Sequence, residues 1–454
     1  MKTTLIKSLI LSSVMFGSLA QAKDTLIVWE DIDKGHGIQA VVEKFKAEYN
    51  CDVILRQNAA YVSHVETYAQ NVKSGGETPD VLMLPADRLG DAAKNGYIVP
   101  LSFMNFDRNK YIPSSISAFT YNREIYAMPR SVEALVMYYN QDLIKYPYEN
   151  FEDYVKFSRD QVKQGRYGVI GKWDVFYFIY GFLSGYGAYV FNDLGGGQLD
   201  PNNIGLDNAG AVAGLNYVNT IVKDILPKEI LGNDGWGKIN EYFINGKVAA
   251  VITGPWDLDA YAAAGMNYGV APVGKLPNGK YFCPFLGYRG YAVTATSKKK
   301  ALAEKFLQYL NKTDNAVARY NEIHEIPPLE EIMSLPQMQN DDFANAVLTQ
   351  ALNAVPMPNI PQMSSVWGPL DSAIQDVLSG KTSADKALHE AVIKIKSDIT
   401  KKHGPKPEPK AEEQKAEEPK ADENATEVVD ATEEVKEDNA DVVINTEDED
   451  ERAE

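Results

Sequence analysis

The chain has 454 residues and a formal net charge of −18, and this length predicts two to three domains rather than one hydrophobic core. Most of the negative charge lies in residues 404–454, which hold 20 Asp and Glu against 6 Lys and Arg. The rest of the chain is therefore nearly neutral. This excludes nucleic acid as an expected partner, because phosphate binding needs a concentrated basic surface.

The first 22 residues have the features of a secretory signal peptide. Lys2 and Lys7 precede an apolar stretch at residues 9–19, and residues 20–22 read Ala-Gln-Ala, a cleavage site that would leave Lys23 as the first mature residue. No cysteine lies near that site, which argues against a lipid anchor. No later segment has the roughly 18 uninterrupted apolar residues of a membrane span. We expect an exported, periplasmic protein of the Gram-negative type.

Strands and helices alternate after the signal peptide. Short apolar runs predict strands at residues 25–29, 52–55 and 80–84, and apolar residues at helical spacing predict helices at 38–49 and 61–73. A βαβαβ unit of this kind forms a parallel sheet with helices on both faces. The sequence therefore predicts an α/β fold.

A second region of the chain shows the same alternation. We expect a helix at residues 207–224 with Asp207 as its N-cap, a strand at 248–253, and an amphipathic helix that is capped by Ser297 and buries apolar residues between 302 and 310. This region is therefore also expected to be α/β.

Charged residues follow the first and third predicted strands. Residues 31–35 read Asp-Ile-Asp-Lys-Gly, and residues 85–88 read Pro-Ala-Asp-Arg. In open α/β sheets, ligands bind outside the carboxyl ends of the strands, so these charges should meet at one rim. Carboxylates and cations suit sugar hydroxyls, in bonds of about 1.5 to 3 kcal/mol when desolvated, and aromatic rings suit the apolar faces of a pyranose. A polyhydroxyl ligand is favoured.

A proline-rich stretch aims one aromatic ring. Prolines at 356, 358 and 361 predict a stiff, extended connector, and Ser364 or Ser365 would cap a following helix in which Trp367 lies one turn from the start. This arrangement would hold a large ring at a rigid helix entrance.

The string from Met357 to Trp367 is similar to the late segment of the periplasmic maltose and maltodextrin-binding proteins, which belong to family 1 of the extracellular solute-binding proteins of ABC transporters. Further matches extend the resemblance from about residue 24 to about residue 402. The resemblance implies two α/β lobes, each with a mostly parallel sheet, that are joined by crossing strands and close by a hinge. Carried over, lobe one is 23–131 with 290–335, and lobe two is 132–289 with 336–402.

The same resemblance implies a set of ligand-binding residues, whose charged members bond sugar hydroxyls and whose aromatic members pack on sugar rings. These residues are Asp33, Lys34, Asp87, Arg88, Glu133, Tyr177, Phe178, Trp256 and Trp367. The implied function is to bind maltose or short maltodextrins, as a monomer, and to deliver them to an inner-membrane permease with its ATPase. A binding protein that presents its ligand to a chemoreceptor would use the same pocket.

The sequence departs from the family at several ligand positions. Leu84 replaces an aromatic ring, and Val175 replaces a glutamate for which the neighbouring Asp174 is a possible substitute. Gly368 and Asp371 replace a tyrosine and an arginine. Compared with the family, the side chains of the inner sugar-binding subsite are retained and those of the outer subsites are replaced. We therefore expect the ligands to be disaccharides or short oligosaccharides that contain glucose.

Two other functions fit the same residues less well. A secreted glycoside hydrolase would use a carboxylate pair among Asp33, Asp87 and Glu133, but the cations beside the two aspartates should lower their pKa values rather than raise them. A binding protein of the same fold for an amino sugar, a polyamine or a chelated metal is the other alternative; Lys34 and Arg88 disfavour a polyamine. The histidines lack metal-site spacing, so we expect no metal. We also expect no cofactor and no enzyme activity.

Cys51 and Cys283 are expected to be two buried free thiols. Residues 403–454 are rich in Glu, Lys, Ala and Pro and lack aromatic residues, so they should be a disordered acidic tail. Two roles are compatible with this tail: it solvates or spaces the folded part, or it contacts a basic partner.

Overall fold

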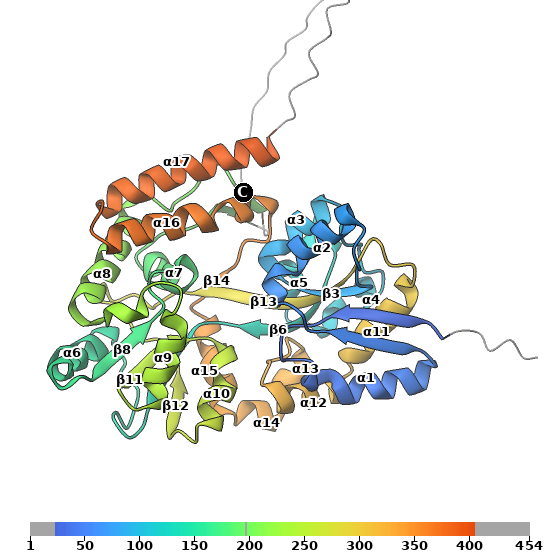
Figure 1. Cartoon of the computed structure of the whole chain (residues 1–454), viewed down its shortest axis with the longest axis horizontal. Coiled ribbons are helices and arrows are strands. Elements are labelled where there is room, and N and C mark those ends of the chain that lie inside the picture. The colour runs from blue at the N-terminus through green and yellow to red at the C-terminus, as the bar shows by residue number, and fades with distance from the viewer. Residues whose placement is uncertain (1–22, 196–197, 405–454) are drawn as a thin grey trace, which may run out of the picture. The chain divides into compact units, whose positions relative to one another are not determined.

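The computed structural model of the chain describes residues 23–195 and 198–404 (Figure 1). The predicted signal peptide and the predicted tail from residue 405 onwards lie outside the described residues. Within the described ranges, every helix is either too short or too polar to cross a lipid bilayer. The fold contains two main sheets, each covered by helices, and two short hairpins.

The first sheet has six strands in the order β14-β13-β3-β1-β2, with β6 paired to β13. Their bounds are β1 Thr25–Trp29, β2 Asp52–Arg56, β3 Val81–Pro85, β6 Met128–Glu133, β13 Phe285–Val293 and β14 Val355–Pro356. β1 is parallel to β2 and β3, while β13 is antiparallel to β3 and to β6. The βαβαβ unit predicted from the sequence is confirmed.

Helices from two distant parts of the chain accompany this sheet, and we call the whole the six-stranded lobe. They are α1 His36–Tyr49, α2 His64–Ser74, α3 Leu89–Lys94, α4 Met104–Asp107, α5 Pro113–Ala118, α11 Lys300–Leu310, α12 Thr313–Ile323 and α13 Glu330–Met333. α1 packs against both α11 and α12, which joins the two parts. The hairpin β4 Thr120–Tyr121 with β5 Glu124–Ile125 leads into β6.

The second sheet has four strands in the order β12-β7-β11-β8. They are β7 Val136–Asn140, β8 Tyr167–Gly171, β11 Val248–Thr253 and β12 Tyr268–Ala271. β11 is parallel to β8 and antiparallel to β7, and β12 is also antiparallel to β7. Three strands therefore share one direction, and β7 alone runs against them because it enters directly from β6. The expectation of a mostly parallel sheet in each lobe is confirmed.

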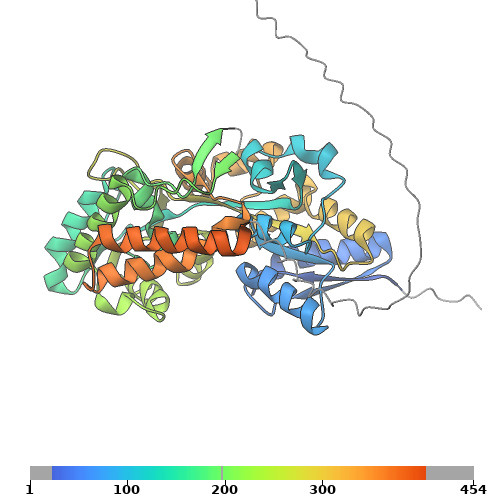
Figure 2. The ribbon, with the colours of Figure 1, turned by 90° about the horizontal axis from the view of Figure 1, so that it is seen from above.

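The helices that accompany this second sheet complete what we call the four-stranded lobe. They are α6 Phe151–Gln161, α7 Phe176–Gly185, α8 Ala209–Ile225, α9 Gly235–Ile244, α10 Leu258–Ala263, α14 Pro336–Gln339, α15 Asp342–Ala351, α16 Trp367–Leu378 and α17 Ala384–His403. The hairpin β9 Asn192–Gly195 with β10 Gln198–Asp200 precedes α8. Seen from above, α16 and α17 lie side by side (Figure 2), and both pack against α8.

The chain passes between the lobes in buried segments. Ala134 and Leu135, which are fully buried, join β6 directly to β7. On the way back, β13 begins at Phe285, whose ring is stacked on Tyr180 of α7 with 3.8 Å between ring centroids and 4° between planes. The described residues fall in one compact unit. The residue ranges assigned to the two lobes from the sequence therefore stay predictions.

Three helix starts differ from the sequence predictions. The N-cap of α8 is Asn208, whose side chain accepts a hydrogen bond from Ala211 N, rather than Asp207. Ser297 lies before the start of α11 and donates its hydroxyl to Asp80 at 2.7 Å. Trp367 is the first residue of α16 and not one turn in, because the stretch Pro361–Ser365 forms a 3₁₀ helix of its own. The prolines therefore aim Trp367 through a short helix.

The assignment of Asn208 as the cap of α8 can be tested by mutation. Asn208→Ala is expected to lower the free energy of unfolding by about 1 kcal/mol, because it leaves an N–H at the helix start without its partner. Asp207→Ala should change it by less than about 0.5 kcal/mol, since its partner is the exposed His389. Urea denaturation of both variants measures the difference; equal losses would contradict the cap.

The two cysteines are free, as expected. Cys51 is buried, whereas Cys283 is only partly buried. Burial raises the pKa of both thiols above the usual value.

Candidate functional site

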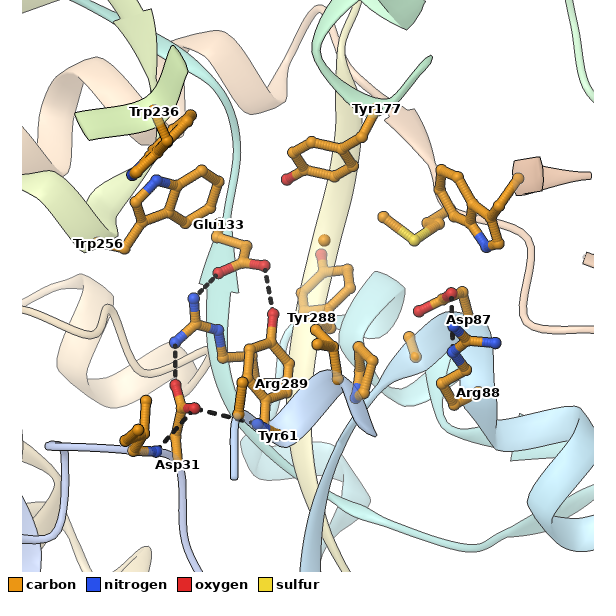
Figure 3. A pocket seen from close by; sticks show the side chains of 18 residues that line it. Asp31, Tyr61, Asp87, Arg88, Glu133, Tyr177, Trp236, Trp256, Tyr288 and Arg289 are labelled. Carbon is orange, nitrogen blue, oxygen red and sulfur yellow. Dashed lines mark hydrogen bonds and ion pairs between the residues drawn. The ribbon is translucent and has the colours of Figure 1, made fainter. Parts of the chain in front are cut away.

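A cavity of about 630 Å³ lies between the two lobes, and most of its lining is aromatic or charged (Figure 3). It is lined by Asp31, Ile32, Ala60, Tyr61, Val62, Pro85, Ala86, Asp87, Arg88, Glu133, Tyr177, Trp236, Trp256, Gly287, Tyr288, Arg289, Met357 and Trp367. The loops after β1 and β3 supply one wall, and α7, α9 and the segment after β11 supply the facing wall. This is the carboxyl-end position that the sheet topology predicts for a ligand.

Six of the nine residues that the resemblance assigned to a ligand line this cavity. They are Asp87, Arg88, Glu133, Tyr177, Trp256 and Trp367. Asp33 is exposed and does not line it, because the chain turns there with a positive φ of 58° and the preceding Asp31 reaches the cavity instead. Phe178 packs behind the wall, with ring centroids 5.2 Å from Trp236 and 6.3 Å from Trp256. Lys34 lies at a narrow side space next to Trp256.

Arg289 organises the acidic side of the cavity. Its guanidinium bonds Glu133 at 2.6 Å and lies 3.7 Å from an Asp31 oxygen. It also covers one face of the Tyr61 ring, 4.5 Å from the centroid, and the Tyr61 hydroxyl donates to Glu133 at 3.3 Å. All four side chains are held by one another, so their oxygens and nitrogens are fixed before any ligand arrives.

A second ion pair lies at the other end of the cavity, where α3 begins. Arg88 bonds Glu66 of α2 at 3.1 Å and lies 3.7 Å from an Asp87 oxygen. Burial raises the pKa of the Asp87 carboxyl, against the opposing charge of Arg88. The expectation that the neighbouring cation would lower this pKa is therefore wrong: at this position desolvation outweighs the charge.

The aromatic wall is built on the four-stranded lobe. Tyr177, at the start of α7, lies 6.2 Å from Trp256, and Trp256 lies 6.3 Å from Trp236 of α9, measured between ring centroids. The Tyr177 hydroxyl and the Trp367 indole nitrogen are buried and have no hydrogen-bond partner among the described residues. Both therefore have unused hydrogen-bonding capacity at the cavity, next to flat apolar faces.

Residues at which the sequence differs from the family have structural roles in this protein. Leu84 is fully buried in β3, so it is a core residue rather than a lost cavity wall. Asp371 accepts a hydrogen bond from Phe176 N at 2.8 Å, at the first residue of α7. Asp174 bonds Lys172 at 2.6 Å and Gly232 N at 2.7 Å. It fixes the loop before α9 and does not substitute for a ligand-binding glutamate at the cavity.

Twelve of the eighteen lining residues were not assigned to a ligand from the sequence, and the polar or aromatic ones that it gave no role at all are Tyr61, Trp236, Tyr288 and Arg289. Arg289 carried a usable signal, since it is a charge within the otherwise uncharged strand from Phe285 to Val293. Trp236 stands between two glycines at a helix start, which is a weaker signal. Tyr61 had none, because its place depends on Arg289, which is distant in the chain.

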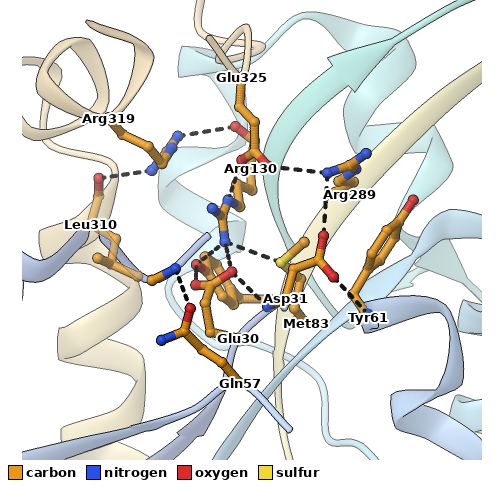
Figure 4. Close-up of polar contacts among 12 residues, drawn as sticks. Glu30, Asp31, Gln57, Tyr61, Met83, Arg130, Arg289, Leu310, Arg319 and Glu325 are labelled. Atoms are coloured by element: carbon orange, nitrogen blue, oxygen red, sulfur yellow. Dashed lines mark hydrogen bonds and ion pairs between the residues drawn. The ribbon is translucent and has the colours of Figure 1, made fainter. Parts of the chain in front are cut away.

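A buried ion network continues from Arg289 into the six-stranded lobe (Figure 4). Glu325 accepts a bond from Arg289 at 3.1 Å and from Arg130 at 2.6 Å. Arg130, which is fully buried, also bonds Glu30 and the Tyr291 hydroxyl. Burial alone would raise the pKa of Glu325, but the charges of Arg130 and Arg289 outweigh it and the pKa is lowered. The wall of the cavity at Arg289 is therefore continuous with a buried network in which each charged side chain has a partner of opposite charge.

Nothing in residues 23–195 and 198–404 groups three His, Cys, Asp or Glu side chains around a space for a metal ion. The polar groups of the cavity are instead paired carboxylates and guanidinium groups beside unpaired hydroxyl and indole donors. Such a set is suited to a neutral ligand with many hydroxyl groups and flat apolar faces.

Comparison with known proteins finds relatives that agree with one another on the family of this chain. Residues 40–346, more than half of the chain, match the family model of bacterial extracellular solute-binding proteins. A galactooligosaccharide-binding protein of Bacillus subtilis is 34% identical over 384 residues, which cover 84% of this chain and 91% of that protein. A maltooligosaccharide ABC transporter solute-binding lipoprotein of Streptococcus pneumoniae is 34% identical over 82% of this chain and 89% of its own length.

The solved structures agree with the fold. MalX from Streptococcus pneumoniae, in complex with maltopentaose, has a TM-score of 0.76 and 32% sequence identity and covers 82% of this chain and 100% of its own. The two-lobed α/β architecture predicted from the sequence is thereby confirmed. On the extent of the family match and the identity to its relatives, this chain belongs to the bacterial extracellular solute-binding proteins.

Proposed function

We propose that this protein binds maltose, a short maltodextrin or a related oligosaccharide in the cavity between its lobes and delivers it to an inner-membrane ABC permease. The observation that carries the proposal is the pairing of Trp256, Tyr177 and Trp367 on one side with the Arg289 and Glu133 pair on the other. Aromatic rings bury the apolar faces of a sugar, and fixed charged groups bond its hydroxyls. The relatives named above supply the transporter context.

Location and partners follow from this assignment. An extracellular solute-binding protein acts outside the cytoplasmic membrane, and the predicted signal peptide favours the periplasm. The partner would be the permease with its ATPase, which recognises the ligand-bound form. Ligand binding would shift the population from open to closed forms by its higher affinity for the closed one.

The cavity supports binding rather than bond cleavage. Both oxygens of Glu133 are engaged, one by Arg289 at 2.6 Å and the other by the Tyr61 hydroxyl at 3.3 Å. A glycosidase needs one carboxyl group that donates a proton and a second that is free to attack or to activate water. We therefore expect no reducing ends to accumulate when the protein is incubated with maltotetraose, as measured by chromatography.

The sugar is identified by titration of the purified mature protein with a panel. Maltose, maltotriose, longer maltodextrins and galactooligosaccharides are compared by calorimetry and by Trp fluorescence, which Trp236, Trp256 and Trp367 should report. We expect saturable heat with maltose or maltotriose. Heat with galactooligosaccharides alone would keep the function and change the sugar, whereas no heat with any sugar would refute the proposal.

Asp87 offers a prediction in which affinity and stability change in opposite directions. Asp87→Asn should weaken sugar binding by about tenfold or more, the value of a charge-assisted hydrogen bond. Because the carboxyl pKa is raised in the folded state, its stabilising contribution is present at low pH and is lost as pH rises through the raised pKa. At pH 7 the variant should therefore unfold at a higher temperature than wild type, and the gain should disappear toward pH 4.

The control for this experiment is Glu43→Gln, which removes an exposed charge from α1 in the same lobe. It should alter neither the sugar affinity nor the pH dependence of the unfolding temperature. Lower stability of Asp87→Asn at pH 7 would show that the buried carboxylate is favourable in the folded state, contrary to the direction of its pKa.

A further inference from the structure

Asp259 is a residue of the four-stranded lobe that bonds two residues of the six-stranded lobe. One carboxylate oxygen is 3.0 Å from Lys34 Nζ, and the other is 3.3 Å from His324 Nδ1. Lys34 lies in the loop between β1 and α1, and Asp259 is the second residue of α10. The contact therefore joins segments more than two hundred residues apart in the chain.

The backbone on both sides holds these groups in place. His324 caps the C-terminus of α12 with a φ of 53°, and Lys34 lies two residues before α1, so both partners of Asp259 adjoin ends of two helices that pack together. α10 directly follows the 3₁₀ turn Pro255–Asp257 that holds Trp256. Lys34, Trp256 and Ile323 surround the narrow side space next to the main cavity. The bridge thus closes the end of the cavity that lies beside Trp256.

The electrostatics favour this bridge at neutral pH. The hydrogen bond from His324 and the charge of Lys34 hold the pKa of Asp259 below its usual value, so the carboxylate is ionised. The Lys34 side chain is 17% exposed and that of Asp259 is 43% exposed. An ion pair of such partial exposure changes an equilibrium constant by about two- to fivefold.

We propose that Asp259 is a positioning residue that latches the two lobes together at this end and orients the Lys34 ammonium toward the cavity. An ammonium group has three donors, so Lys34 keeps N–H groups for a ligand hydroxyl while one is held by Asp259. The latch favours the closed arrangement of the cleft before any ligand binds. Its effect on affinity rests on the proposed sugar-binding function, whereas its effect on the cleft does not.

The latch is tested first without ligand. Spin labels at Ala47→Cys on α1 and Ala213→Cys on α8, with Cys283 replaced by serine, report the distance between the lobes by double electron–electron resonance. Asp259→Asn should lengthen and broaden this distance, and Asp259→Lys, which places two cations together, should lengthen it further. His324→Asn, which tolerates the positive φ, should give a smaller increase. The matched control is Glu77→Gln, because Glu77 pairs with Arg56 at 3.1 Å within the six-stranded lobe and should leave the distance unchanged.

The second readout is sugar affinity by calorimetry, with the tightest ligand of the panel. Asp259→Asn should weaken it by about two- to fivefold and Glu77→Gln should not. Distances for Asp259→Asn and Asp259→Lys that superimpose on wild type would overturn the latch, even if sugar binds. Longer distances without sugar binding in wild type would support the latch and refute the proposed function.

Discussion

Replacing Trp256 by alanine is expected to weaken sugar binding by about 70-fold. A sugar face stacked on an indole removes on the order of 100 Å² of apolar surface from water, which at about 25 cal/mol per Å² is worth about 2.5 kcal/mol. Trp256 lines the cavity next to Tyr177 and Trp236, so its loss removes the centre of the aromatic wall. Isothermal titration calorimetry with the sugar that binds wild type measures the change.

Two further variants make this result interpretable. Trp256→Phe keeps a flat ring and should lose less than half of that free energy. Tyr146→Ala removes an aromatic side chain that is 69% exposed and does not line the cavity, so it should bind like wild type. Unchanged affinity in Trp256→Ala, with its thermal unfolding intact, would mean that the ligand lies elsewhere.

The largest stability effect is expected at Arg130. Arg130→Met should lower the free energy of unfolding by about 3 to 5 kcal/mol at pH 7, because it leaves the buried Glu30 without its cation and leaves Glu325 paired with Arg289 alone. Arg56→Met, which breaks only the exposed pair with Glu77, should cost less than about 1 kcal/mol. Urea denaturation of both variants gives the comparison.

The pH dependence of Arg130→Met has a definite sign. In wild type the pKa of Glu325 is lowered, so its contribution to stability is present above the pKa of the unfolded chain and is lost as pH falls through the folded one. Without Arg130, less charge opposes the desolvation of Glu325, so the pKa of this carboxyl group should rise. The deficit of the variant should therefore shrink between pH 7 and pH 5, and a deficit that is constant over this range would contradict the network.

Much of the fold could be predicted from the sequence, because its signals are local. The strands β1, β2 and β3 are short apolar runs, and α1 buries residues at helical spacing. Helix starts were less predictable. Several polar residues stand near each start, and only the folded backbone decides whether Asn208 or Asp207 accepts the capping bond.

The candidate site was predictable mainly where the family resemblance assigned a residue. Trp256 and Trp367, which the resemblance placed on a sugar ring, both line the cavity. Residues that depend on distant partners were not predictable. Arg289 reaches the cavity only because β13 crosses between the lobes, and Lys34 is held by Asp259 from the other lobe. The pKa of Asp87 was mispredicted because its burial is a property of the assembled cleft.

The parallel stack of Tyr180 on Phe285 fixes where a domain rotation can pivot. Two rings 3.8 Å apart and within 4° of parallel tolerate little sliding before their contact is lost. A rotation axis that preserves this stack must pass close to it, so side chains there move least. Ile32 and Val62, which are exposed and line the cavity from the six-stranded lobe, would be displaced relative to the aromatic wall by such a rotation.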